Sequence, residues 1–123
     1  YKKQSIRTMT PGEIVVRLIG ELEKCIAIAA SAIGKKDYQQ ANESFMKAQS
    51  CISALRNLLD MKIEISSNLD KLYEYFSHEI LQANIKKDAD RAKAVLSMVA
   101  ELKEAFYTIS QQPKEGEQKA ATV

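Results

Sequence analysis

Apolar residues recur along most of the chain at the three- and four-residue spacing of an amphipathic helix. The first run follows Thr10-Pro11-Gly12-Glu13, in which Thr10 and Glu13 can form a capping box and Pro11 suits the first helical position. Gly34 ends this run, as a glycine at a helix C-terminus commonly does. The predicted first helix therefore carries the stripe Ile14, Val15, Leu18, Ile19, Leu22, Ile26, Ala29 and Ile33.

Three further runs have the same period. Asp37 is placed to cap the second helix, with Gln40 three residues later, and Asp88 to cap the fourth. A short connection near residues 60–64 separates the second helix from the third. The apolar stripes are Ala41, Phe45, Ala48, Ile52, Leu55 and Leu59; then Leu69, Leu72, Tyr73, Phe76, Ile80 and Ala83; then Ala92, Val95, Leu96, Val99, Leu102, Phe106 and Ile109.

A short sequence that occurs twice indicates how the helices are connected. Gly34-Lys35-Lys36-Asp37 and Ile85-Lys86-Lys87-Asp88 both stand between consecutive helices, so the chain is interpreted as two αα-hairpins. Short connections make neighbouring helices antiparallel. We therefore predict an all-α, antiparallel up-down four-helix bundle over residues 10–111. A short extended strap over residues 1–9 precedes it, and a polar, aperiodic tail over residues 112–123 is predicted to be disordered.

The composition limits the classes of protein to which this chain can belong. The 123 residues suit one domain, and 46% hydrophobic residues can supply its core. The net charge of +2 and the absence of a basic stripe argue against nucleic-acid and membrane binding. Cys25 and Cys51 fall in apolar helical patterns without metal-ligand spacing, so free, packed thiols are expected. With neither a signal peptide nor a long apolar run, the expected location is the cytoplasm.

The residues favour a binding protein over an enzyme, and no cofactor is expected. A di-metal site in a helix bundle needs a Glu-x-x-His pair, but Tyr75 stands three residues before the single histidine, His78. A histidine phosphotransfer domain that uses an exposed His78 is the alternative function. Such domains place a lysine and a glycine soon after the histidine, whereas this chain continues Glu79-Ile80-Leu81-Gln82-Ala83.

Several segments together resemble the flagellin export chaperone family (FliS), from Tyr1 to about Phe106. The matching segments are Tyr1-x-x-Gln4-Ser5-Ile6-x-Thr8-x-Thr10-Pro11-x-Glu13-Ile14, Ala41-Asn42-Glu43, Lys47-Ala48-Gln49, Asn68-Leu69-Asp70-Lys71-Leu72-Tyr73-Glu74-Tyr75-Phe76 and Gln82-Ala83-Asn84-Ile85-Lys86-Lys87-Asp88. Their order and spacing along one short chain carry the resemblance. The chain departs from the family at Ile19-Gly20-Glu21, in the glycine-free segment 60–65, and at Phe106 in place of a tryptophan.

The resemblance implies a cytoplasmic export chaperone. It would bind the disordered C-terminal segment of flagellin in apolar grooves, prevent premature polymerisation and present its client to the flagellar export apparatus. Weak homodimerisation is left open. The client-binding residues expected from the resemblance are Leu69, Leu72, Tyr73, Tyr75, Phe76 and Asn84, together with Tyr1 and Ile6 of the strap. Tyr1 and Ile6 are apolar anchors in a polar segment, which suggests that the strap covers part of the groove until the client displaces it.

Overall fold

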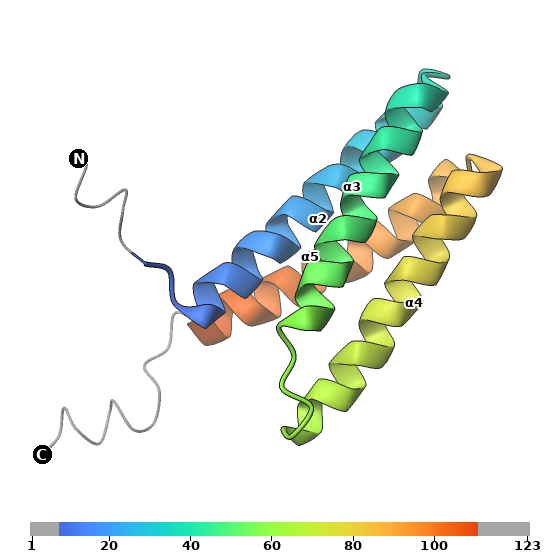
Figure 1. Ribbon diagram of the computed structural model, residues 1–123. Helices are drawn as coiled ribbons and strands as arrows, with labels where there is room; N and C mark the ends of the chain where they lie inside the picture. The colour runs from blue at the N-terminus through green and yellow to red at the C-terminus, as the bar shows by residue number, and fades with distance from the viewer. Residues whose placement is uncertain (1–7, 111–123) are drawn as a thin grey trace, which may run out of the picture.

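The structure is a computed structural model, and it describes residues 8–110. Four helices follow one another: α2 (Pro11–Gly34), α3 (Tyr38–Asn57), α4 (Glu64–Lys86) and α5 (Ala89–Ser110). They lie alongside one another as a bundle (Figure 1). The predicted four-helix bundle is confirmed, while Tyr1, Ile6 and the predicted tail lie outside the described residues.

Side-chain caps fix the predicted helix starts. The Thr10 hydroxyl accepts a hydrogen bond from the Glu13 N–H at 3.1 Å, and Glu13 Oε1 accepts one from the Thr10 N–H at 3.0 Å. Asp37 Oδ1 accepts from the Gln40 N–H at 3.1 Å, and Asp88 Oδ1 accepts from the Arg91 N–H at the same distance. Each bond satisfies a backbone donor that has no partner within its own helix.

The repeated Lys-Lys-Asp sequence has a structural explanation. The second lysine of each copy is left-handed, with φ of 60° at Lys36 and 50° at Lys87. The following N–H reaches back into the helix, from Asp37 to the Ala32 carbonyl at 2.8 Å and from Asp88 to the Ala83 carbonyl at 2.9 Å. Both turns therefore end one helix with a Schellman motif and cap the next with the aspartate. Gly34 does end α2, but the left-handed residue is a lysine two positions later.

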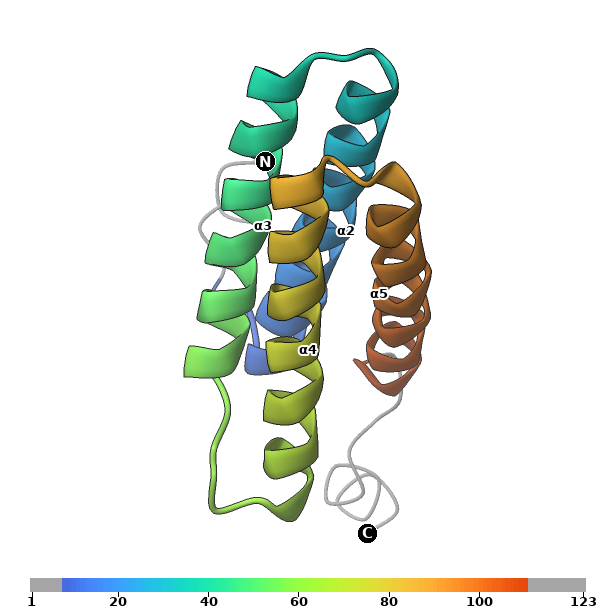
Figure 2. The ribbon, with the colours of Figure 1, turned by 90° about the vertical axis from the view of Figure 1, so that its right-hand side faces the viewer.

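α2 is the helix on which the bundle is built. It packs most extensively, against α3 on one side and α5 on the other, while α4 contacts α3 and α5 less. α2 and α4 thus occupy opposite corners, as a comparison of Figures 1 and 2 shows. The fully buried large side chains are Ile19, Leu22, Ile26, Phe45, Ile52, Leu55, Tyr73, Phe76, Ile80, Val95 and Val99.

The two cysteines belong to this core. Cys25 and Cys51 are buried free thiols, as the sequence predicted. Burial is the main cause that raises the pKa of both, and that of Cys51 reaches about 11. Because the thiolate is the reactive form, both groups are chemically quiet near neutral pH.

Two expectations need correction at the end of the bundle where α2 begins. Ile109 was placed in the apolar stripe of the last helix, but its side chain is 64% exposed. The connection between α3 and α4 covers residues 58–63, so it begins earlier than predicted. The described helices include none that is long and apolar enough to cross a membrane.

Candidate functional site

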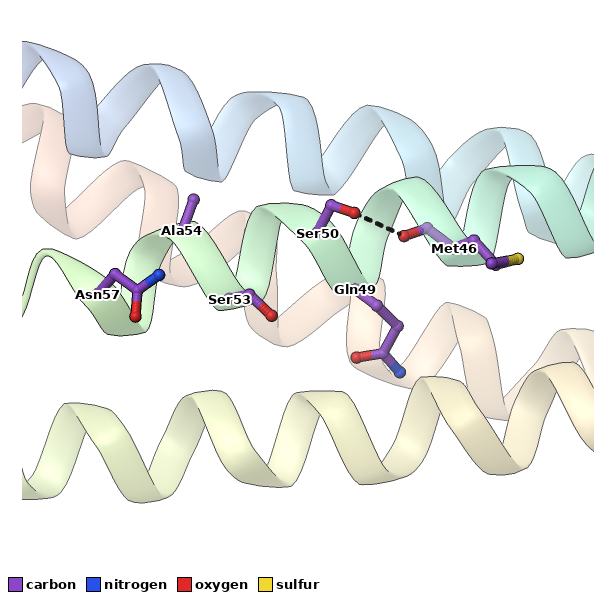
Figure 3. Close-up of a pocket in the computed structure, with 6 residues that line it drawn as sticks. All are labelled: Met46, Gln49, Ser50, Ser53, Ala54 and Asn57. Atoms are coloured by element: carbon purple, nitrogen blue, oxygen red, sulfur yellow. Dashed lines mark hydrogen bonds between the residues drawn. The ribbon is translucent and has the colours of Figure 1, made fainter.

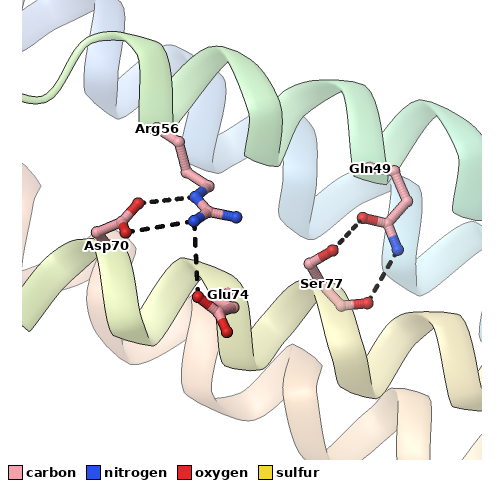
Figure 4. Close-up of polar contacts among 5 residues, drawn as sticks. All are labelled: Gln49, Arg56, Asp70, Glu74 and Ser77. Carbon is pink, nitrogen blue, oxygen red and sulfur yellow. Dashed lines mark hydrogen bonds and ion pairs between the residues drawn. The ribbon is translucent and has the colours of Figure 1, made fainter.

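Polar side chains link α4 to α3 at three levels, here called the rungs. Asn84 Nδ2 donates to Asn42 Oδ1 at 2.9 Å. The Ser77 hydroxyl donates to Gln49 Oε1 at 2.7 Å, and Gln49 Nε2 donates to the Ser77 carbonyl at 2.9 Å. Arg56 Nε and Nη2 donate to the two oxygens of Asp70 at 2.7 and 3.2 Å. Figure 4 shows the second and third rungs.

The rungs are spaced regularly along both helices. Each step of seven residues forward on α3, through 42, 49 and 56, matches a step of seven back on α4, through 84, 77 and 70. The two helices therefore run in opposite directions in one register. A polar pair every second helical turn specifies that register, because sliding either helix would separate all of the partners.

The Arg56–Asp70 rung is the charged one. Its hydrogen bonds hold the pKa of Asp70 below the ordinary carboxyl value and raise that of Arg56. Glu74 also approaches Arg56, with Oε2 at 3.7 Å from Nη2. A forked guanidinium–carboxylate pair has a defined orientation, so this rung contributes to the alignment of the two helices.

The opposite side of α4 faces α5, and it has an ion pair and an apolar hollow in place of polar rungs. Near the end of α4, Glu79 pairs with Arg91 of α5 at 3.5 Å. Leu72, seven residues before Glu79 on α4, and Met98, seven residues after Arg91 on α5, line a hollow of about 290 Å³. The remaining lining residues of this hollow are Phe76, Glu101 and Leu102.

Beyond the hollow the two helices leave apolar side chains uncovered. Ile65 of α4 is 61% exposed, although it lies seven residues from Leu72 on the same helical face. Ile109, seven residues beyond Leu102 on α5, is exposed to a similar degree. We call this strip the α4–α5 seam, defined by Ile65, Leu72, Phe76, Met98, Leu102 and Ile109. It is closed by an ion pair at one end and apolar and open at the other.

The connection that leads into α4 extends the exposed apolar surface. Leu58, Met61 and Ile63 are all at least half exposed. The residue that precedes α4 is Ile63, which offers no side-chain cap. Large exposed apolar side chains gathered at one end of a molecule mark a surface for a partner.

The expected client-binding residues lie in different environments: the hollow, the core, the surface and a rung. Leu72 and Phe76 meet in the hollow, and Leu69 is partly buried against the core. Tyr73 and Phe76 are buried, and burial raises the pKa of Tyr73 to about 12. Tyr75 is 47% exposed, so one of the two tyrosines reaches the surface. Asn84 lies on the α3 side in a rung.

Sequence reasoning missed other residues of the hollow. Met98 and Glu101 line it, but neither was assigned to a predicted stripe or site. Leu102 was expected only in the core, and Ile65, which belongs to the seam beyond the hollow, only in the loop. The available signal was the spacing of Ile65 and Leu72, which places both on one face of α4.

A second hollow, of about 530 Å³, lies on α3 (Figure 3). It is lined by Met46, Gln49, Ser50, Ser53, Ala54 and Asn57, all from one helix. Most of these side chains are short or polar, so this hollow offers an apolar partner less than the α4–α5 seam does.

Other kinds of site have less support. His78 is exposed, as the phosphotransfer alternative requires, but exposure is the one structural feature in favour of that function. Within residues 8–110, no three His, Cys, Asp or Glu side chains gather in a way that could hold a metal ion.

Comparison with known proteins gives a consistent result. The family model "Flagellar protein FliS" matches residues 1–113. The flagellar secretion chaperone FliS of Bacillus subtilis is 35% identical over 106 residues, which cover 86% of this chain and 80% of that protein. The Vibrio cholerae protein of the same name is 34% identical, over 89% of this chain and 85% of its own length. FliSB of Pseudomonas aeruginosa is 30% identical, over 89% and 92%.

Proposed function

This chain belongs to the FliS family of flagellar secretion chaperones, and we propose that it serves flagellar export by binding the disordered C-terminal segment of flagellin. The chaperone role follows from the family. The observation that supports the finer proposal is the α4–α5 seam, in which an apolar hollow is followed on both helices by exposed apolar side chains.

The shape and chemistry of the seam suit a helix that forms on binding. A flexible client segment can place large apolar side chains in the hollow beside Leu72 and Met98 and along the exposed Ile65 and Ile109. Apolar burial then offsets the entropy lost when the segment becomes ordered. Flagellin held in this way has its assembly segment covered, which prevents premature polymerisation.

The proposed strap fits the same end of the bundle. The described chain begins at Thr8, just before α2, and the start of α2 lies at the end of the bundle where α5 finishes (Figure 1). The exposed Ile109 of the seam belongs to that end of α5. Residues 1–7 are therefore joined to the bundle near the open end. We include in the proposal that Tyr1 and Ile6 cover part of the seam before the client arrives.

The remaining parts of the proposal concern place and partners. The chaperone would hold its client in the cytoplasm, deliver it to the flagellar export apparatus and need no cofactor. Its open apolar seam would also account for weak homodimerisation in the absence of client. Sedimentation of the free protein and of the complex measures this, with the dimer expected to disappear once the seam is filled.

Calorimetry with the full chain and the C-terminal flagellin peptide of the same organism tests the proposal. Met98→Ser removes an apolar side chain from the hollow, and we expect the affinity to fall about tenfold, as losing roughly 1–2 kcal/mol of apolar burial implies. Met46→Ser on the outer face of α3 is the matched control, because Met46 is also exposed but lies away from the seam. Equal losses for the two variants would argue against the seam, and absence of binding to the unmodified chain would argue against flagellin as client.

A further inference from the structure

Glu101 is the one charged residue among the five that line the hollow between α4 and α5. The other four are Leu72, Phe76, Met98 and Leu102, so the hollow is apolar with a single carboxylate at its edge. The Glu101 side chain is exposed, and its acid group is accessible to a molecule that occupies the hollow.

This carboxylate has no partner within the described part of the chain. No ion pair or hydrogen bond joins another described residue to Glu101. On its own helix, the residues three and four positions away are Ser97, Met98, Glu104 and Ala105, none of them basic. One of these neighbours is a second acid, which is unfavourable for both carboxylates at that spacing.

Other acids at the α5 interfaces are paired. Glu79 of α4 faces Arg91 of α5, and Glu23 of α2 accepts a hydrogen bond from Lys103 of α5. Glu101 lies between these two pairing positions along α5 but faces the open hollow. A basic group could therefore reach it from a molecule docked in the seam.

We propose that Glu101 selects clients whose docking helix carries a lysine or arginine about one turn from the apolar residue that fills the hollow. This inference rests on the proposed client-binding role of the seam. The apolar anchor supplies most of the affinity, and the salt bridge to Glu101 fixes which helical face of the client enters and in which direction. Charge pairs at the edge of an interface act chiefly on orientation and specificity in this manner.

A charge-exchange experiment with the full chain tests this assignment. The probe is the C-terminal flagellin peptide of the same organism, together with variants in which each Lys or Arg is changed to Glu in turn. We expect Glu101→Gln to weaken binding of the unmodified peptide about two- to fivefold, as an exposed ion pair allows, and Glu101→Lys to weaken it further. Much of this loss should vanish in about 1 M salt, where screening is nearly complete.

Restoration of binding is the decisive result. One Lys→Glu or Arg→Glu peptide should bind Glu101→Lys better than the unmodified peptide does, and should bind the unmodified chain worse. Glu104→Lys is the matched control, since Glu104 is exposed on the same helix but does not line the hollow.

Two negative outcomes have different meanings. If the unmodified peptide binds but Glu101→Lys and Glu104→Lys behave alike, or no peptide variant restores binding, the role of Glu101 is wrong while the client assignment stands. If the unmodified peptide fails to bind the unmodified chain, the client assignment is wrong and the inference about Glu101 is lost with it.

Discussion

The two sides of α4 make different kinds of contact. Towards α3, the helix is joined by evenly spaced polar rungs, from Asn84 to Asn42 at one end and Asp70 to Arg56 at the other. Towards α5, it has one ion pair, to Arg91 near the start of α5, then an apolar hollow and uncovered isoleucines. The rungs specify where α4 lies, whereas the seam leaves apolar surface available.

This contrast shows how a small bundle can expose an apolar surface and still keep one structure. Hydrogen bonds at partly exposed positions add little net stability, but they require particular partners at particular positions. Apolar contacts are less selective, and a different apolar side chain can replace them. A helix with specific contacts on one side can therefore have an exchangeable partner on the other.

The largest expected effect tests whether the buried apolar residues of α4 hold this helix in the bundle. Phe76 is completely buried, and Phe76→Ala should lower the free energy of unfolding by about 3–5 kcal/mol because it leaves a cavity. Tyr75→Ala is the control, since its ring is tilted against Phe76 with centroids 6.4 Å apart but is about half exposed. Urea unfolding should show a loss of less than about 1 kcal/mol for the control. Similar losses for both variants would mean that Tyr75 is also a core residue.

A smaller effect is expected from the middle rung. Gln49→Ala, Ser77→Ala and the double variant form a thermodynamic cycle, and the coupling energy should be about 0.5–1.5 kcal/mol because the cycle isolates the hydrogen bond from the Ser77 hydroxyl to Gln49 Oε1. The bond from Gln49 Nε2 goes to the backbone carbonyl of Ser77, so Ser77→Ala leaves it in place. Binding of the flagellin peptide should stay the same, because the rung lies away from the seam. A coupling near zero, or a loss of peptide binding, would remove the distinction between the two sides.

The smallest effect concerns the charged rung and its dependence on pH. Because Arg56 lowers the pKa of Asp70 in the folded chain, the rung stabilises the fold above the ordinary aspartate pKa of about 3.9, and this contribution is lost as the pH falls through the lowered value. Asp70→Asn should therefore reduce the urea midpoint slightly at pH 7 and leave it unchanged near pH 2. In an Arg56→Gln background the Asp70→Asn change should have little effect at either pH. An undiminished Asp70→Asn effect in acid would show that charge pairing is not its cause.

Local signals in the sequence were sufficient for the helices themselves. Thr10 with Glu13, Asp37 and Asp88 define helix starts because their side chains bond to N–H groups a few residues away. The apolar period likewise identifies the inward face of each helix, and the repeated Lys-Lys-Asp turns reflect a motif completed within six residues. Such interactions depend on neighbours in the sequence, so they can be predicted from it.

The surroundings of α4 depended on the tertiary structure. An amphipathic stripe shows which face points inward, but not how closely the adjoining helices approach that face. The stripe correctly placed Tyr73 inside and left Tyr75 out, but for this reason the exposure of Ile109 was not foreseen. The rungs join residues 14 to 42 positions apart, and the hollow combines α4 with α5. The sequence determined four amphipathic helices and the capped starts of three of them; how those helices pack decided that one side of α4 is fixed by polar pairs and the other left apolar and open.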